Sequence, residues 1–170
     1  IFRSFGAYDD LGEIVGEAVR GVDTEGVVVQ STEDDEEQVN IIELKEVVEG
    51  APVIKLTNAL LTRAISMRAS DIHVEPQQRR VRIRFRVDGL LQEVMVVPKD
   101  IQHPLISRIK IMASLDIAER RSPQDGRCTL VTPQGAFDFR VSTFPSVFGE
   151  NVVIRILDKS AAMIDLTKLG

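Results

Sequence analysis

Residues 81–89 read VRIRFRVDG, and this stretch decides the expected fold. Apolar residues occupy positions 81, 83, 85 and 87, and arginines occupy positions 82, 84 and 86. Such alternation is typical of a strand with one buried face. Asp88 and Gly89 follow it, and Asp-Gly is among the strongest short signals for a tight turn. The sequence therefore predicts a β-hairpin whose return strand stops at Pro98.

Helical spacing of apolar residues is found on both sides of this hairpin. Residues 52–69 predict a helix that begins at Pro52 and ends before Asp71, with apolar residues at steps of three and four. A first strand then runs over residues 72–76. Residues 101–117 predict a second amphipathic helix whose solvent side carries Arg108 and Lys110.

Three further strands are predicted in the last third of the chain. They cover residues 128–132, 136–144 and 151–157, with a tight turn at 133–135 and a longer loop over 144–151. Residues 118–127 are expected to form a polar loop. Short sequential strands with helices between them predict an α+β fold, an antiparallel sheet with helices packed on it.

Charge divides the chain near residue 50. Residues 1–50 hold 14 acids and 3 bases, a net charge of −11, whereas residues 51–170 hold 12 acids and 18 bases, a net charge of +6. The first part predicts an acidic lead-in that is partly helical or flexible, with a domain boundary between residues 38 and 52. The basic second part indicates contact with an anion or an acidic surface, and a plain solvated surface is the alternative.

Several classes of protein are excluded or disfavoured by composition. No apolar run approaches the ~20 residues that span a bilayer. Cys128 is the single cysteine, so no internal disulfide can form, and with two histidines no zinc site is expected. No glycine is followed by lysine, so the chain cannot build a Walker phosphate loop by itself. The start at Ile1, without an initiator Met, is expected of a fragment.

Arg140 and Arg155 are the leading candidate site residues. If the last two strands pair with residue numbers that sum to 295, Arg140 lies opposite Arg155 on one side of the sheet. Two guanidiniums ~5 Å apart at an effective dielectric constant of ~20 repel by roughly 3 kcal/mol. A slip of one residue would separate them to opposite faces.

Two explanations could offset this repulsion. Asp138 and Glu150 are nearby carboxylates that could compensate the arginines locally. Alternatively, a phosphate supplied by another domain or subunit could do so, because the planar guanidinium donates hydrogen bonds in pairs and stays charged. Val153 and Leu157 flank Arg155 and predict its partial burial.

Other charged residues have simpler interpretations. The stripe at 82, 84 and 86 lacks exposed aromatic residues for base stacking, so no nucleic-acid partner is expected, and a solvent face or an acidic partner is favoured. His73 is interpreted as a structural histidine that Glu75 could hold, and Asp71 as a cap at a chain end. Arg127 is a weaker candidate for reaching an anion.

Five ordered motifs resemble one family, the type II secretion and type IV pilus assembly ATPases. The resemblance covers about residues 50–170. The motifs are ASDIHVE at 69–75, RFRVDG at 84–89, LDIAERR with PQDGR at 115–127, RVST with FGE at 140–150, and IRILDK at 154–159.

The resemblance implies a PAS-like N-terminal domain over residues 51–160, followed at 161–170 by the start of a linker to a RecA-like ATPase domain. It implies a cytoplasmic homo-hexamer, peripheral at the inner membrane, which uses ATP with Mg²⁺ and binds an inner-membrane platform or adaptor proteins. Arg140 and Arg155 would reach the nucleotide phosphates. Arg127 is a weaker candidate, and Leu166 and Leu169 would lie near the base. The Walker motifs would lie beyond Gly170, so this chain alone should not hydrolyse ATP.

Two other functions stay open from the sequence. One is a sensory PAS-like module that holds a small ligand inside its sheet. The other is an adaptor domain that docks a membrane platform through the acidic lead-in without any catalytic role.

Overall fold

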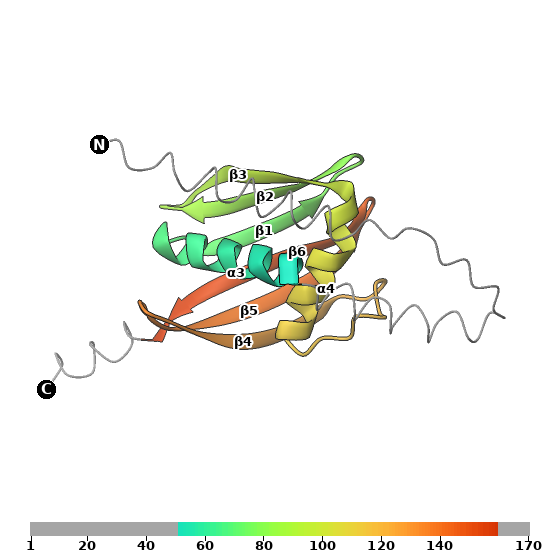
Figure 1. Cartoon of the computed structure of the whole chain (residues 1–170). Coiled ribbons are helices and arrows are strands. Elements are labelled where there is room, and N and C mark those ends of the chain that lie inside the picture. Colours follow the sequence, from blue (N-terminus) through green and yellow to red (C-terminus); the bar gives the residue numbers. More distant parts are fainter. Residues whose placement is uncertain (1–50, 160–170) are drawn as a thin grey trace, which may run out of the picture.

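The computed structural model describes residues 51–159, which form one antiparallel sheet of six strands with two helices on one face (Figure 1). This confirms the predicted α+β fold. The acidic lead-in at 1–50 and the linker at 161–170 lie outside the described residues. The elements are α3 (Ala51–Ser66), β1 (Asp71–Pro76), β2 (Arg80–Val87), β3 (Leu90–Pro98), the 3₁₀ turn η1 (Lys99–Ile101), α4 (Gln102–Met112), β4 (Gln124–Thr132), β5 (Gly135–Ser146) and β6 (Gly149–Asp158).

The sheet is two three-stranded units joined edge to edge. Its strand order is β3-β2-β1-β6-β5-β4, so β1 and β6, the first and last strands in sequence, lie side by side at the centre. Ile72 lies opposite Ile154 across this junction. The junction also includes a hydrogen bond from the Ile156 amide to the Ser70 carbonyl, at 3.0 Å.

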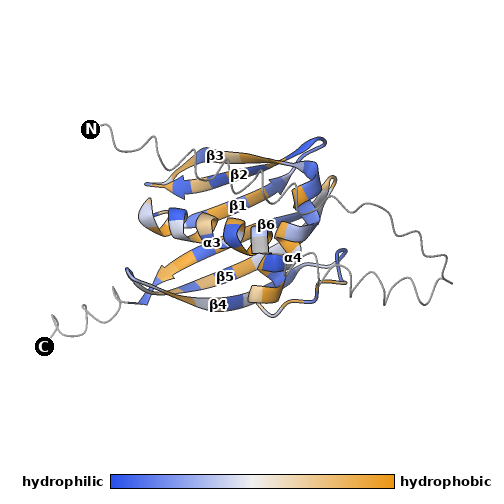
Figure 2. Ribbon diagram, in the orientation of Figure 1, coloured by the Kyte–Doolittle hydropathy of each residue, from blue (hydrophilic) through white to orange (hydrophobic). Residues whose placement is uncertain are grey.

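The alternating pattern separates the sheet into a covered face and an open face. α3 and α4 pack across the covered face (Figure 1), and orange apolar bands alternate with blue polar bands along the strands (Figure 2). Phe85 from β2 and Phe139 from β5 both have no exposed surface, and they lie in one core with Leu56 of α3 and Leu105 of α4. The odd-even pattern of the sequence thus positions all the side chains of the open face.

The prediction was right for the β2–β3 hairpin turn and wrong for the β5–β6 hairpin turn. Asp88 and Gly89 have φ of 51° and 80°, as a two-residue hairpin turn requires, which confirms that prediction. The longer loop predicted over 144–151 is wrong, because β5 and β6 continue to Ser146 and Gly149. Gly149 has φ of +133°, and a Cβ there would clash with the side chain of Gln102. Glycine is therefore required where this hairpin turns against α4.

Helix α4 ends at Met112, five residues before the predicted end at Ile117. Ser114 adopts φ of 58°, and the Leu115 amide donates to the Lys110 carbonyl at 2.8 Å, which closes the helix. The chain then passes so close to β4 that a Cβ on Gly126 would lie 2.5 Å from the Ala113 carbonyl oxygen. The predicted polar loop at 118–127 is correspondingly shifted to residues 113–123, since β4 already begins at Gln124.

Lys110 forms a buried ion pair, although the sequence placed it on the solvent side of its helix. Its side chain is 1% exposed, and its Nζ lies 2.5 Å from Oε1 of Glu150 at the start of β6. The same ammonium donates to the carbonyl oxygens of Glu119, at 2.6 Å, and Asp116, at 3.3 Å. Charge pairing and these carbonyls together offset the desolvation of the lysine. The pair fastens α4 and the loop after it to the β5–β6 hairpin.

The two edge strands of the sheet differ in regularity. β3 carries a bulge at Val94, because Ile83 of β2 pairs with Met95 and the next residue pairs with Glu93. β4 pairs without interruption with β5 over all its nine residues.

Neither described helix is long and apolar enough to cross a membrane.

His73 lies in the middle of β1, on the open face, between Arg84 of β2 and Val153 of β6. Its Nε2 is buried and has no hydrogen-bond partner. Burial lowers the pKa of the imidazole below its ordinary value of 6.5, against the raising effects of Glu75 and Asp71. The interpretation that Glu75 holds this ring is wrong, because that carboxylate bonds to arginines instead. His73 is therefore favoured in its neutral form.

We expect Glu150→Gln to reduce the free energy of unfolding by about 3–5 kcal/mol, because it leaves the Lys110 ammonium buried without a counter-charge. Urea denaturation followed by circular dichroism measures this. The exposed pair between Asp138 and Lys159 is the control, since Asp138→Asn should change stability little. Equal losses in the two variants would contradict the role given to the buried pair.

We expect stability to decrease as pH falls below about 6.5, because the folded state holds the pKa of His73 below its unfolded value and protonation then favours unfolding. The stability is fully present above the unfolded pKa. Denaturation curves at about pH 7.5 and about pH 5.5 would measure the loss. His73→Gln should reduce this pH dependence, and an unchanged slope in that variant would assign it to another group.

Candidate functional site

A row of charged side chains crosses the open face, with one residue from each of five neighbouring strands. We call it the arginine row. Its members, in order of their register from β2 to β4, are Arg86, Asp71, Arg155, Arg140 and Arg127. Four arginines and one aspartate give it a net charge of +3. No prediction from the sequence anticipated a continuous row, because the strand order was not predicted.

The predicted pairing of Arg140 with Arg155 is confirmed. The two residues are direct partners in the β5–β6 ladder, so they share the open face. The predicted partial burial of Arg155 is wrong, because its side chain is 68% exposed and its neighbour Leu157 is 38% exposed. Solvent screening therefore reduces their mutual repulsion well below the roughly 3 kcal/mol expected of a half-buried pair.

The local acid beside this pair is Asp71, which the sequence suggested was a chain-end cap. Its residue is 7% exposed, and its Oδ1 accepts a hydrogen bond from Nε of Arg155 at 3.2 Å. Its Oδ2 accepts from Oγ of Ser70 at 2.8 Å and lies 3.6 Å from Nε of Arg86. Asp71 is therefore shared by the two arginines that flank it in the row.

The two carboxylates predicted to compensate the arginine pair do not do so. Glu150 is on the covered face with Lys110. Asp138 is exposed and binds Lys159 at 3.1 Å. Its hydrogen bond from Thr129 and its pairing with Lys159 lower the pKa of the Asp138 carboxyl. Both acids are committed to other cations.

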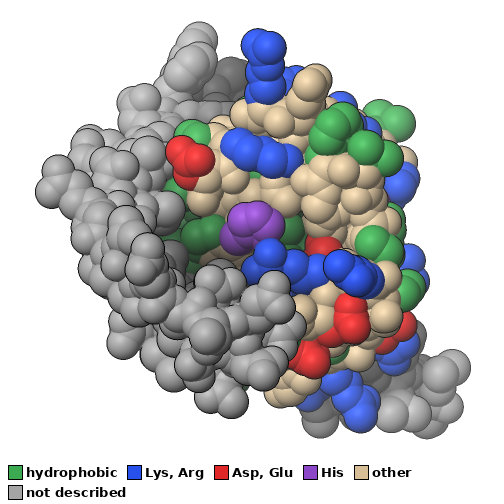
Figure 3. All heavy atoms as spheres, turned by 90° about the vertical axis from the view of Figure 1, so that its right-hand side faces the viewer, with side chains coloured by type: hydrophobic (Ala, Val, Ile, Leu, Met, Phe, Trp, Pro, Cys, Tyr) green, Lys and Arg blue, Asp and Glu red, His purple; other side chains and the backbone are tan. Residues whose placement is uncertain are grey.

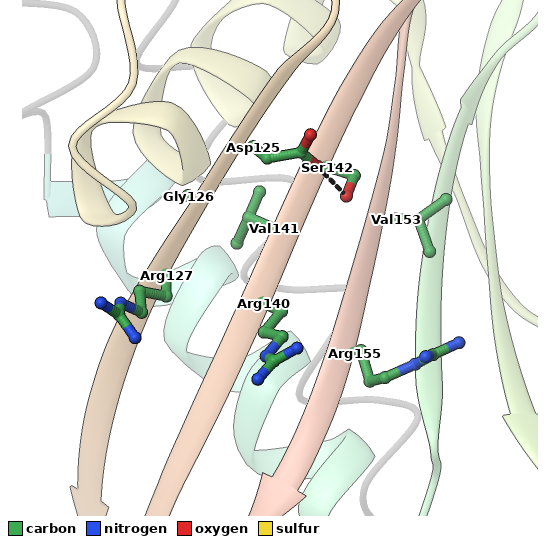
Figure 4. Close-up of a pocket in the computed structure, with 8 residues that line it drawn as sticks. All are labelled: Asp125, Gly126, Arg127, Arg140, Val141, Ser142, Val153 and Arg155. Atoms are coloured by element: carbon green, nitrogen blue, oxygen red, sulfur yellow. Dashed lines mark hydrogen bonds between the residues drawn. The ribbon is translucent and has the colours of Figure 1, made fainter.

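Arg140 and Arg127 have no salt bridge with any of the described residues. They line a shallow depression of about 560 Å³ on the open face, together with the hydrogen-bonded pair Asp125–Ser142 and parts of β6. Figure 4 shows that the guanidinium of Arg155 extends toward β1, away from that of Arg140. The half of the row over β5 and β4 therefore holds positive charge that no carboxylate of residues 51–159 binds in a salt bridge, although Asp125 lines the same depression.

The arginine stripe of β2 is partly compensated within the chain. Oε2 of Glu75 accepts from Nε of Arg82 at 2.9 Å, and its Oε1 accepts from a terminal nitrogen of Arg84 at 2.5 Å. Burial alone would raise the pKa of the Glu75 carboxyl, but the hydrogen bonds from both arginines outweigh it and hold that pKa below its ordinary value. The stripe therefore has a local carboxylate partner, and its expected contact with solvent or an acidic partner stays a prediction.

Lysine and arginine side chains also gather around a histidine at the end of the domain shown in Figure 3. Lys99 belongs to this end, and its Nζ donates to the carbonyl oxygens of Gln77, at 2.6 Å, and Phe148, at 2.9 Å. Gln102 donates to the same Phe148 oxygen at 3.1 Å. These contacts join the β1–β2 and β5–β6 turns to α4, so Lys99 has a structural role.

The arginine row suits an anion better than a metal ion. Guanidinium groups donate hydrogen bonds in planar pairs that match phosphate oxygens. Within residues 51–159, no group of three His, Cys, Asp or Glu side chains is placed to hold a metal. Leu166 and Leu169, the predicted contacts to a nucleotide base, lie outside the described residues.

Comparison with known proteins identifies the family. The family described as "Type II/IV secretion system protein" matches residues 46–170. The type IV pilus assembly ATPase PilB of Myxococcus xanthus (strain DK1622) is 54% identical over 79% of this chain and 24% of its own length. The type II secretion system protein E of Klebsiella pneumoniae is 56% identical over 71% of this chain and 24% of its own length.

The aligned part of the chain thus spans about a quarter of these relatives. A crystal structure of the pilus retraction motor PilT with bound ADP matches at a TM-score of 0.42 and 22% identity, over 59% of this chain and 28% of that one. The match over residues 46–170 and the identities above 50% show that the chain belongs to the type II/IV secretion system protein family.

Proposed function

We propose that this chain is the PAS-like N-terminal domain of a secretion or pilus assembly ATPase, and that it supplies arginines to the phosphates of a nucleotide. Arg140 and Arg155 are the principal contacts, and Arg127 is a weaker one. The domain extends over residues 51–160, and residues 161–170 begin the linker to the ATPase domain. The observation that carries this proposal is the uncompensated charge of the arginine row over β5 and β4.

Repulsion between neighbouring arginines is the physical basis of the proposal. Arg140 is the register partner of Arg155 on one side and of Arg127 on the other. Like charges opposite each other destabilise a sheet, so their retention on one face suggests that an anion is bound there. A phosphate chain carries several negative charges and accepts paired hydrogen bonds from each guanidinium. The proposed site spans three adjacent strands, and a planar, permanently charged donor suits it.

In this role the arginines bind and orient the phosphates and stabilise the charge that builds up on them. ATP with Mg²⁺ is the proposed cofactor, bound mainly by the ATPase domain, and it supplies the phosphoryl group that is transferred to water. Electrostatic stabilisation of this kind needs donors that are fixed before the reaction, and strands fix them better than loops do. Leu166 and Leu169 would lie beside the base.

The proposed setting is the one that the motif resemblance implies. The parent protein is a homo-hexamer that assembles through its ATPase domain in the cytoplasm, at the periphery of the inner membrane. It binds an inner-membrane platform or cytoplasmic adaptor proteins. Nucleotide binding would draw the arginine row toward the ATPase domain, so phosphate chemistry would produce a rigid-body movement of the domain.

The alternative functions have less support. A sensory domain would need an enclosed apolar cavity for a ligand between sheet and helices, but the cavity beside Phe139, Thr57 and Ile154 has a volume of only about 10 Å³, which is at the lower limit for a single water molecule. A hollow of about 640 Å³ at the end of α3 is larger, but Arg68, Gln134 and Asp158 stand in its wall. An adaptor role through residues 1–50 would leave the charge of the arginine row without an explanation.

We expect Arg140→Ala in the full-length protein to lower ATP turnover by about 10²-fold, because one fixed donor to the phosphates is lost. Steady-state phosphate release under saturating ATP with Mg²⁺ measures the effect. Thermal unfolding should be nearly unchanged, since Arg140 is exposed and has no salt bridge with a described residue.

Arg80→Ala is the matched control, because Arg80 is an exposed arginine of β2 that bonds only to Gln77, at 2.7 Å, among the described side chains. Turnover in this variant should equal that of the wild-type protein. Wild-type turnover in Arg140→Ala would overturn the proposed function.

A further inference from the structure

Asp71 and Glu75 lie on the same face of β1 and each binds two arginines, but they bind them differently. Glu75 reaches a terminal nitrogen of both arginines, at 2.8 Å for Arg82 and 2.5 Å for Arg84, and it also accepts from Nε of Arg82 at 2.9 Å. Asp71 contacts both of its arginines through Nε, at 3.2 Å for Arg155 and 3.6 Å for Arg86. A carboxylate that binds Nε leaves the outer end of the guanidinium available.

Arg155 is the most exposed of these four arginines. The side chains of Arg82, Arg84 and Arg86 are 31%, 27% and 38% exposed, whereas that of Arg155 is 68% exposed. The terminal nitrogens of Arg155 have no hydrogen-bond partner among the described residues. Arg155 is therefore held at Nε, while its terminal nitrogens reach into solvent.

Asp71 itself is firmly held. Its side chain is 10% exposed and accepts a hydrogen bond from Ser70. The Ser70 carbonyl in turn accepts from the amide of Ile156, the residue after Arg155. The carboxylate and the arginine that it binds are thus fixed to the same stretch of the β1–β6 ladder. This rigidity is what a group that directs another side chain requires.

Stability alone does not account for this contact. An ion pair with one exposed partner contributes little to the free energy of folding, typically about 0–1 kcal/mol. The contact has a larger effect on the direction in which the Arg155 guanidinium points. A free arginine side chain samples many rotamers and loses that freedom when it binds an anion. A fixed Nε restricts those rotamers before any anion arrives.

We propose that Asp71 is a positioning residue, which holds Arg155 by its Nε so that both terminal nitrogens are presented to a phosphate. This inference rests on the proposed function, in which Arg155 meets the nucleotide. Asp71 makes no contact with the phosphate. It repels the phosphate slightly as a like charge, so its net benefit comes through Arg155.

A double-mutant cycle in the full-length protein tests this inference, with kcat and KM for Mg²⁺-ATP measured by phosphate release. Asp71→Ala should lower kcat/KM by about 10-fold, and Arg155→Ala should lower it by more. The double variant should match Arg155→Ala alone, because Asp71 has no function without its arginine. Asp71→Asn keeps an acceptor for Nε and should restore much of the lost activity.

Glu75→Ala is the matched control, since it frees two arginines of the same face that lie outside the arginine row. It should reduce stability, measured by thermal unfolding, and leave kcat/KM near the wild-type value. A loss of activity equal to that of Asp71→Ala would show that any damage to this face lowers turnover, which would overturn the inference.

The other outcomes are also decisive. Additive losses in the double variant would mean that Asp71 acts through the fold or through Arg86, and the inference would fail while the proposed function stands. Faster turnover in Asp71→Ala would mean that Asp71 competes with the phosphate for Arg155, with the same consequence. Wild-type activity in Arg155→Ala would instead overturn the role of that arginine in the proposed function, and the inference with it.

Discussion

The pairing of β1 with β6 is the constraint on which the rest of the structure depends. These strands lie more than seventy residues apart in the chain, and their apolar residues fix the register. Ile72 faces Ile154 and Val74 faces Val152, and all four residues are 3% exposed or less. A slip of one residue would expose these side chains and turn Arg155 into the core. Burial of the covered face thus sets the alignment of the charges on the open face.

The open face is electrostatically uneven as a result. Over β1 and β2, Glu75 and Asp71 each bind two arginines, which are Arg82 and Arg84 for Glu75 and Arg86 and Arg155 for Asp71. Over β5 and β4, Arg140 and Arg127 face solvent and form no salt bridge in the described part of the chain. Both halves carry excess positive charge, but only the first half pairs its arginines with carboxylates.

Much of this arrangement could be predicted from short-range patterns. The alternation at 81–87 and the turn at Asp88-Gly89 gave the first hairpin, and the turn centre near Phe148 gave the register that pairs Arg140 with Arg155. Pattern alone could not reveal that β1 adjoins β6, because strand order depends on packing between distant segments. The role of Asp71 therefore stayed hidden, although its position next to His73 and Glu75 in an alternating strand was a usable signal.

The burial of Lys110 was missed for a related reason. A lysine on a helix is usually exposed, and only the β5–β6 hairpin, which brings Glu150 under α4, makes its burial favourable. The start of β4 was misjudged because the glycine at 126 was included in the predicted polar loop. This glycine lets β4 pass close to the chain at Ala113. Predicting that role would require knowing which segment lies beside it.

The regular ladder of β4 has one more consequence. Proteins commonly guard the outermost strand of a sheet with a kink, a proline or a charge, so that it does not recruit a strand from another molecule. β3 has its bulge, but β4 has no irregularity and carries its charges, Asp125 and Arg127, only in its first half, while its second half ends in Leu130, Val131 and Thr132, with Val131 80% exposed. A copy of the domain on its own would be most prone to self-associate and precipitate along β4. The solubility of the domain therefore depends on what shields that strand.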